Sequence, residues 1–168
     1  MTGDVRIRAA RKDDAPRLAE IFNQGIEDRV ATFQTARQDA AALASVMAGE
    51  RPVVVGELDG EIAGWAKVGA YDDDHDYYAG VGEATLYVAR EARRLGLGKS
   101  LLEALAREAE SRGFHKLIGK IFTSNEASIA LVRECGWREV GVHLRHGRLD
   151  GEWKDVLVVE RLLGDTAD

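Results

Sequence analysis

A short glycine-rich and basic segment, residues 93–100, constrains the fold and function of this chain more than any other feature. The segment reads Arg93-Arg94-Leu95-Gly96-Leu97-Gly98-Lys99-Ser100 and lies between a strand-like stretch and a leucine-rich helical stretch. Glycines allow a tight turn and leave backbone N–H groups bare, and the N-terminus of the next helix adds partial positive charge. The pattern predicts a loop that binds phosphate or pyrophosphate. Its spacing matches neither a Walker A loop nor the dinucleotide fingerprint, and the alternative is a glycine-rich connector with solvated cations.

Strand-like and helical segments alternate on both sides of this phosphate loop. Apolar or alternating runs predict strands at 5–9, 52–58, 61–71, 81–88, 117–122, 137–144 and 152–160. Helical spacing predicts helices that begin near Asp13, at 40–48, at 97–109 and after Asn125. Asp59-Gly60 and Asp150-Gly151 predict type I′ hairpin turns. We expect one domain, residues 1–168, of the α/β (α+β) class, with a mixed sheet covered by helices on both faces.

Composition excludes several classes of protein. The 168 residues carry 29 acidic and 23 basic side chains, a net charge of −6, which gives no general affinity for nucleic acid. No apolar run approaches the ~18 residues of a membrane helix, and the polar start Met1–Arg6 is unlike a signal peptide, so we expect a cytoplasmic protein. A single cysteine, Cys135, excludes a disulfide framework and a cysteine-rich zinc site. We expect no metal, and Cys135 to be a small buried side chain.

Several motifs together resemble a known superfamily over nearly the whole chain. The spacing Arg93-x-x-Gly96-x-Gly98 after Tyr87-Val88 resembles the acetyl-coenzyme A (acetyl-CoA) loop of the GNAT N-acetyltransferases, and 125–137 resembles their second cofactor-contacting motif. The segments 25–33 and 147–155 resemble the narrower group that acetylates phosphinothricin, methionine sulfoximine and arsinothricin. The resemblance implies the GNAT fold, a mostly antiparallel mixed sheet of about seven strands flanked by about four helices.

This resemblance also assigns the acetyl-CoA site. It implies that backbone N–H groups at 95–99 hold the pyrophosphate, and that Leu86 and Val88 pair with the pantetheine arm through their main chain. Asn125 either hydrogen-bonds the pantetheine or only caps its helix. The expected cofactor-binding residues are Leu86, Tyr87, Val88, Arg93, Arg94, Leu95, Gly96, Leu97, Gly98, Lys99, Ser100, Asn125 and Ser128.

Glu83 is the expected catalytic base. It stands in an otherwise apolar strand, and the resemblance implies that it faces the active site. An amine must lose a proton before it attacks a thioester, and a free carboxylate is a poor base for an ammonium ion unless burial or a water helps. The alternative is an outward-facing glutamate paired with a neighbour. The N–H near Val88 is expected to receive the oxyanion, so the catalytic residues are Glu83 and Val88.

On the substrate side, the sequence departs from the family pattern twice. Many members carry a general-acid tyrosine seven residues after the motif asparagine, where this chain has Val132, so we expect the thiolate to leave unaided. Relatives carry an arginine in the loop where this chain has Asp72–Asp76, which we term the acidic loop; it is either a solvated tip or a filter for cations. The expected substrate-binding residues are Arg29, as a replacement for that arginine, Phe33, Glu83, His146 and Trp153.

The function that follows is direct transfer of acetyl from acetyl-CoA to the α-amine of a small amino acid in a ternary complex. The matched segments favour an acceptor of the phosphinothricin, methionine sulfoximine or arsinothricin type. The alternatives are another amine, such as a polyamine or a peptide N-terminus, and a non-catalytic module that binds acyl-CoA. The resemblance also implies a homodimer, with neither nucleic acid nor membrane as a partner.

Overall fold

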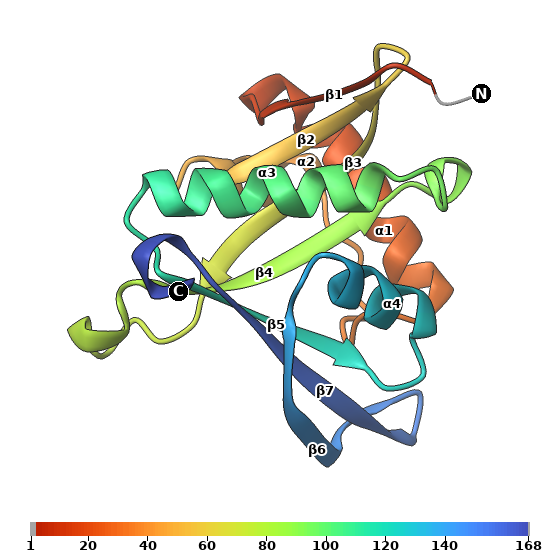
Figure 1. Ribbon diagram of the computed structural model, residues 1–168. Helices are drawn as coiled ribbons and strands as arrows, with labels where there is room; N and C mark the ends of the chain where they lie inside the picture. Colours follow the sequence, from red (N-terminus) through yellow and green to blue (C-terminus); the bar gives the residue numbers. More distant parts are fainter. Residues whose placement is uncertain (1–2, 168) are drawn as a thin grey trace.

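The computed structural model describes residues 3–167 and contains a seven-stranded sheet with four α-helices (Figure 1). The strands are β1 (Val5–Ala9), β2 (Val53–Leu58), β3 (Glu61–Ala70), β4 (Val81–Val88), β5 (Lys116–Phe122), β6 (Arg138–Leu149) and β7 (Glu152–Leu162). The helices are α1 (Ala15–Asp28), α2 (Ala40–Met47), α3 (Leu97–Ser111) and α4 (Glu126–Glu134).

The sheet has the order β1-β2-β3-β4-β5-β7-β6. Every neighbouring pair is antiparallel except β4 and β5, which run parallel. Helix α3 crosses one face of the sheet, and α1 and α2 lie behind the other in the view of Figure 1. The expected fold class, a mostly antiparallel mixed sheet with helices on both faces, is therefore confirmed.

Both predicted hairpin turns have the expected backbone. Asp59 and Gly60 have φ angles of 52° and 87°, and Asp150 and Gly151 have 51° and 82°, the paired positive values of a type I′ turn. The predicted end of the strand at 144 was wrong, because β6 continues to Leu149. Its pairing with β7 is irregular around residues 139–141 and 143–147, where Arg145 has a φ of 50°, and this disrupts the alternation from which strands are recognised.

Two glycines hold α3 close to the sheet and so position the phosphate loop. A Cβ at Gly56 would lie 2.7 Å from Leu97 Cδ1, and one at Gly64 would lie 3.0 Å from both Leu101 Cδ1 and the Tyr87 carbonyl oxygen. Leu97 and Leu101 are buried in the core between helix and sheet. The N-terminus of α3 is therefore fixed beside the end of β4.

Strands β4 and β5 pair over only a short stretch. Their register runs from Val81 opposite Lys116 to Glu83 opposite Ile118, and no pairs follow within the described chain. Beyond that point β4 remains paired with β3 as far as Val88, and β5 remains paired with β7 as far as Phe122. Strand β4 follows β3 and strand β5 follows β7, so β4 and β5 separate and the sheet opens at Glu83.

Candidate active site

The opening between β4 and β5 contains a cavity of about 440 Å³, here called the central cavity. Its walls come from both faces of the sheet. Leu86 lies on the α3 face, where a Cβ at Gly98 of α3 would approach its Cδ2 to 3.4 Å. Tyr87 lies on the α1 face, where its ring centroid is 5.1 Å from that of Phe22. The central cavity therefore connects the two faces of the sheet.

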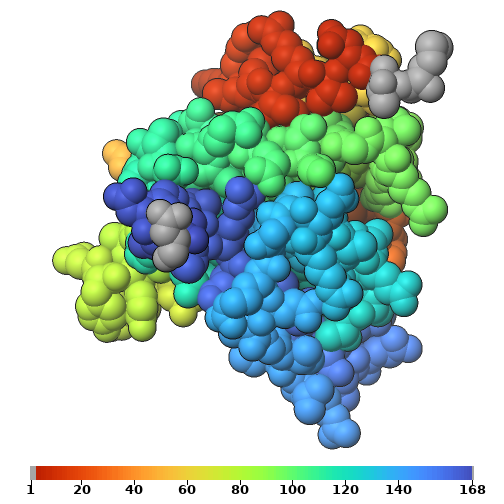
Figure 2. All heavy atoms as spheres, viewed as in Figure 1, coloured from red at the N-terminus to blue at the C-terminus, as the bar shows by residue number. Residues whose placement is uncertain are grey.

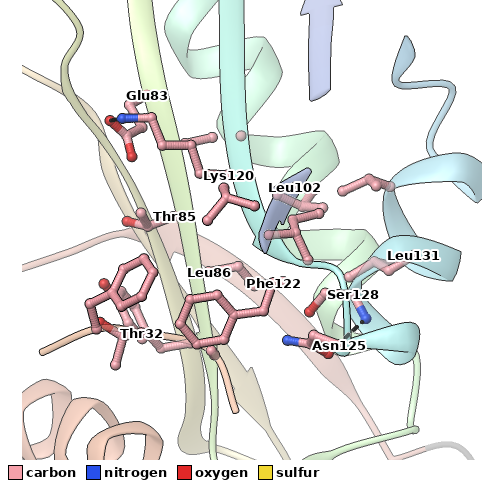
Figure 3. A pocket seen from close by; sticks show the side chains of 18 of the residues that line it. Thr32, Glu83, Thr85, Leu86, Leu102, Lys120, Phe122, Asn125, Ser128 and Leu131 are labelled. Atoms are coloured by element: carbon pink, nitrogen blue, oxygen red, sulfur yellow. Dashed lines mark hydrogen bonds and ion pairs between the residues drawn. The ribbon is translucent and has the colours of Figure 1, made fainter. Parts of the chain in front are cut away.

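At one end of the central cavity, Asn125 caps α4. Its Oδ1 accepts a hydrogen bond from the Ser128 backbone N–H at 3.3 Å, as the sequence predicts. Figure 3 shows the Asn125 amide nitrogen turned away from the helix, while Ser128 and Leu131 form the neighbouring wall. Capping uses the oxygen and leaves the amide N–H groups available, so the cap and a ligand contact are compatible roles.

The phosphate loop presents fewer free charges than its sequence indicates. Arg93 forms an ion pair with Asp28 at 2.7 Å and donates to the Val88 carbonyl at 3.3 Å. Lys99 pairs with Glu134 at 2.9 Å. Arg94, with a φ of 64°, forms no ion pair with any of residues 3–167. Backbone N–H groups, the N-terminus of α3 and Arg94 are therefore the groups best able to hold an anion.

The backbone of β4 suits an extended polar ligand in the opening. The Ala89 N–H donates to Ala63 of β3, and the backbone groups of successive residues in a strand face opposite sides, so those of Leu86 and Val88 face away from β3. On the same side of the sheet as α3, Trp137 lines the central cavity. Its buried Nε1 has no hydrogen-bond partner within the part of the chain that the structure describes. These groups fit the amide-rich pantetheine arm of acetyl-CoA.

Glu83 marks the point where the two strands separate. It lines the central cavity, and its Oε2 lies 3.2 Å from Nζ of Lys120, which projects from β5 (Figure 3). Glu83 therefore faces the cavity and is also paired with a neighbour. Sequence reasoning missed Lys120, although it is the single charge in the apolar strand 117–122.

Of the other expected substrate residues, two line the central cavity and two do not. Phe33 packs edge-on against Phe122 with ring centroids 4.7 Å apart, and the exposed His146 also borders the cavity. Arg29 instead lies 3.3 Å from the Asp150 carboxylate. Trp153 is 52% exposed and packs under the guanidinium of Arg148 at 4.2 Å.

The acidic loop lies away from the cavity walls. None of Asp72–Asp76 is among the residues that line the central cavity. Asp73 pairs with Arg51 at 2.6 Å, and the Asp72 carboxylate accepts a hydrogen bond from the Asp74 N–H at 2.9 Å. In the space-filling view of Figure 2 this segment projects from the body of the molecule at the left. The arrangement favours a solvated tip.

Burial favours the protonated forms of the Tyr87 hydroxyl and the Cys135 thiol. Burial raises the pKa of Tyr87, whose ring stacks on Trp65 at 4.5 Å between centroids. Burial also raises the pKa of the Cys135 thiol, in keeping with its expected role as a small core residue. Val132 lines the central cavity where other family members are expected to carry tyrosine, so no hydroxyl stands at that position.

Residues 3–167 include no group of three or more His, Cys, Asp or Glu side chains arranged to hold a metal ion. Over the same residues, none of the helices combines the length and the apolar character needed to span a bilayer.

Known proteins are similar to this chain in sequence and in structure. The profile described as "Acetyltransferase (GNAT) family" matches residues 16–137. The phosphinothricin N-acetyltransferase of Alcaligenes faecalis is 30% identical over 95% of this chain and 84% of that protein. The L-methionine sulfoximine/L-methionine sulfone acetyltransferase of Pseudomonas paraeruginosa is 29% identical over 95% of each. A phosphinothricin acetyltransferase of the GNAT superfamily from Sinorhizobium meliloti, solved in complex with acetyl-CoA, has a TM-score of 0.89 at 29% identity and covers 98% of this chain and 90% of that one.

Proposed function

Because the chain belongs to the acetyltransferase (GNAT) family, we propose that it acetylates the α-amino group of a small amino-acid-like acceptor. It is an N-acetyltransferase that uses acetyl-CoA as the donor. The proposed acceptors are of the phosphinothricin, methionine sulfoximine or arsinothricin type, and the first two occur in the names of the relatives. The observation that carries the proposal is the central cavity, which joins the acetyl-CoA face to the opposite face at Glu83.

Residues on the α3 face would hold acetyl-CoA, which supplies an acetyl thioester when bound. The backbone N–H groups at 95–99 and the side chain of Arg94 bind the pyrophosphate. The backbone of Leu86 and Val88 pairs with the pantetheine arm as an added strand would. Asn125 donates from its amide to the same arm. This is the division of roles that the motifs imply, and the unpaired polar groups of the opening support it.

Glu83 removes the proton that the acceptor amine must lose. Lys120 Nζ lies 3.2 Å from the carboxylate and forms an ion pair with it. A carboxylate is a weak base for an ammonium ion, so a bridging water is the expected route for the proton. The backbone N–H near Val88 donates to the oxyanion that forms in the opening. With valine at 132, the thiolate departs without a proton donor.

A panel of acceptors tests this proposal. We expect kcat/KM for phosphinothricin, methionine sulfoximine and arsinothricin to exceed that for a polyamine and for a peptide with a free N-terminus. Acetyl-CoA at saturation should stabilise the fold by more than ~2 kcal/mol in thermal unfolding. Stabilisation without turnover of any amine would support the non-catalytic module, and a preference for the polyamine would support the alternative enzyme.

Variants of the acidic loop separate these two enzymes further. We expect Asp73→Asn together with Asp74→Asn to leave kcat/KM for the anionic amino acids nearly unchanged, because neither residue lines the central cavity. Loss of polyamine turnover in the same variants would instead identify the loop as a filter for cations.

The proposed assembly is a homodimer. Strand β6 forms one edge of the sheet, and its apolar side chains Val140, Val142 and Leu144 are 48%, 49% and 75% exposed. Native sheets seldom leave a long apolar edge strand uncovered, and a second copy of the chain presents the same edge.

A further inference from the structure

A second cavity of about 190 Å³ adjoins the central cavity on the face of the sheet that α1 and α2 cover. The two cavities share Gln34 and Tyr87 as wall residues. The second is also lined by Lys67 and is here called the Lys67 chamber. The two cavities therefore lie next to each other, with Gln34 and Tyr87 between them.

Lys67 is placed on the same face of the sheet as Glu83. In the pairing of β3 with β4, Lys67 lies opposite Thr85, and Gly69 lies opposite Glu83. Residues directly opposite each other project from the same face, and a diagonal pair such as Lys67 and Glu83 has Cα atoms about 7–8 Å apart. Gly69 has no side chain to separate them. This spacing allows one small molecule to contact both residues.

The ammonium group of Lys67 has no ionic partner within residues 3–167. The side chain is half-buried, and it forms no hydrogen bond or ion pair with any of residues 3–167. Burial lowers the pKa of Lys67; Glu83 on β4 opposes this effect and Arg51 adds to it. A lysine that burial disfavours is stabilised when an anion binds beside it. Within the described residues, the Lys67 ammonium group in the chamber is therefore left without a counterion.

The other polar groups of the Lys67 chamber are suited to an anion. Trp65 is 1% exposed, and its Nε1 is a buried donor without a partner among the described residues. Gln34 and Gln38 add amide groups. The backbone of Gln38 is fixed, because Asn23 both donates to its carbonyl and accepts from its N–H, each at 2.9 Å. No Asp or Glu is among the described residues that line the chamber.

We propose that Lys67 and the chamber around it bind a carboxylate or similar oxyanion of the acceptor and so select anionic amino acids. This inference rests on the proposed function, in which the acceptor is an amino acid, and it names the group that recognises the charge. Lys67 takes the role that the sequence assigned to Arg29, which lies outside both cavities. It also explains how a chain with an acidic loop at 72–76 accepts an anionic substrate.

The test compares three acceptors in the wild-type protein and three variants. The first acceptor, methionine sulfone, carries one anionic group, its α-carboxylate. The second is the α-carboxamide of methionine sulfone, which carries no anionic group. The third, phosphinothricin, carries a phosphinate in addition to its α-carboxylate. We expect Lys67→Met to lower kcat/KM for methionine sulfone about 10- to 100-fold, as for a lost hydrogen bond to a charged group, and to change that for the carboxamide little. Lys67→Arg should retain most of the activity. The exposed Lys12→Met, which removes the same charge far from the cavities, should leave all three unchanged.

The outcomes distinguish this inference from the proposed function. A loss confined to phosphinothricin would assign the site to the side-chain anion, and a loss with methionine sulfone would assign it to the α-carboxylate. Equal effects on all three acceptors, or no effect on any of them, would overturn the role of Lys67. If the wild-type protein turned over none of these acceptors, the proposed function would fail, and calorimetric titration in the presence of coenzyme A would decide the inference. Tighter binding of acid than carboxamide, lost in Lys67→Met, supports it, and the absence of that difference refutes it. If Lys67→Met does not fold, Lys67→Gln serves in its place.

Discussion

Glu83 and Lys120 form an ion pair where the sheet opens, although they come from strands with little pairing between them. Replacing Glu83 with Gln keeps the size and the hydrogen-bonding capacity of the side chain but removes its ability to accept a proton. We expect Glu83→Gln to lower kcat about 10²- to 10⁴-fold, as for loss of a general base. The acetyl-CoA dissociation constant from calorimetry should change little.

The matched control for this variant is Glu61→Gln. Glu61 is exposed at the start of β3 and lines neither cavity, so the activity of the Glu61→Gln variant should equal that of the wild type. An unchanged pH–rate profile in Glu83→Gln would show that another group accepts the proton.

Asp14 provides a residue-scale test of stability. Its carboxylate accepts two hydrogen bonds from Arg8, at 2.8 and 3.0 Å, and one from the Arg11 N–H at 2.7 Å. The Arg8 hydrogen bonds are the main cause of the lowered pKa of Asp14. A lowered carboxyl pKa gives stability that is present above the unfolded value of 3.8 and lost as pH falls through the folded value.

Asp14→Asn should therefore reduce the free energy of unfolding by about 2 kcal/mol at pH 7. The difference from the wild type should persist down to the unfolded pKa and shrink only below it. Urea unfolding at pH 7 and at successively lower pH measures this, with the exposed Asp13→Asn as the control. A difference that disappeared at mildly acidic pH would contradict the assigned ion pair.

At the scale of elements, the packing of α3 against α4 shapes the acetyl-CoA side of the site. A Cβ at Gly98 would lie 3.0 Å from Leu131 Cδ2 of α4 and 3.4 Å from Leu86 Cδ2 of β4. Gly98→Val should therefore displace a cavity wall as well as crowd the phosphate loop. Overpacking of this kind costs about 1–3 kcal/mol.

We expect Gly98→Val to weaken acetyl-CoA binding at least about tenfold by calorimetry, the equivalent of 1.4 kcal/mol, and to lower the Tm. Gly141→Val is the matched control, because a Cβ there meets no atom within 4 Å. Acetyl-CoA affinity equal to that of the wild type in Gly98→Val would contradict the placement of the cofactor.

The elements themselves were predictable because their signals are local. Helical spacing, the Asn125 cap and the two Asp-Gly turns each depend on a few neighbouring residues, and all are observed. The opening between β4 and β5 was not predictable, since it depends on each strand following a different partner. For the same reason sequence reasoning missed Lys120 and Lys67, which reach the site only through the order of the strands.

For the whole molecule, the uncovered edge of the sheet predicts an assembly. The exposed Val140, Val142 and Leu144 of β6 are expected to be buried against a second copy. Sedimentation at micromolar concentration should give a mass of about twice the 18.4 kDa of one chain. The Leu144→Lys variant should shift this mass toward that of the monomer. If the wild-type protein sedimented only as an 18.4 kDa species, the predicted dimer would be contradicted.

The central claim is that the opening at Glu83 allows the acceptor amine and the acetyl thioester to meet directly. Initial velocities measured over a grid of acetyl-CoA and methionine sulfoximine concentrations test it most directly. Direct transfer requires both substrates to be bound at once, so the account predicts double-reciprocal lines that intersect, with no acetylated enzyme detected by mass spectrometry. Parallel lines, together with an enzyme acetylated by acetyl-CoA alone, would contradict it.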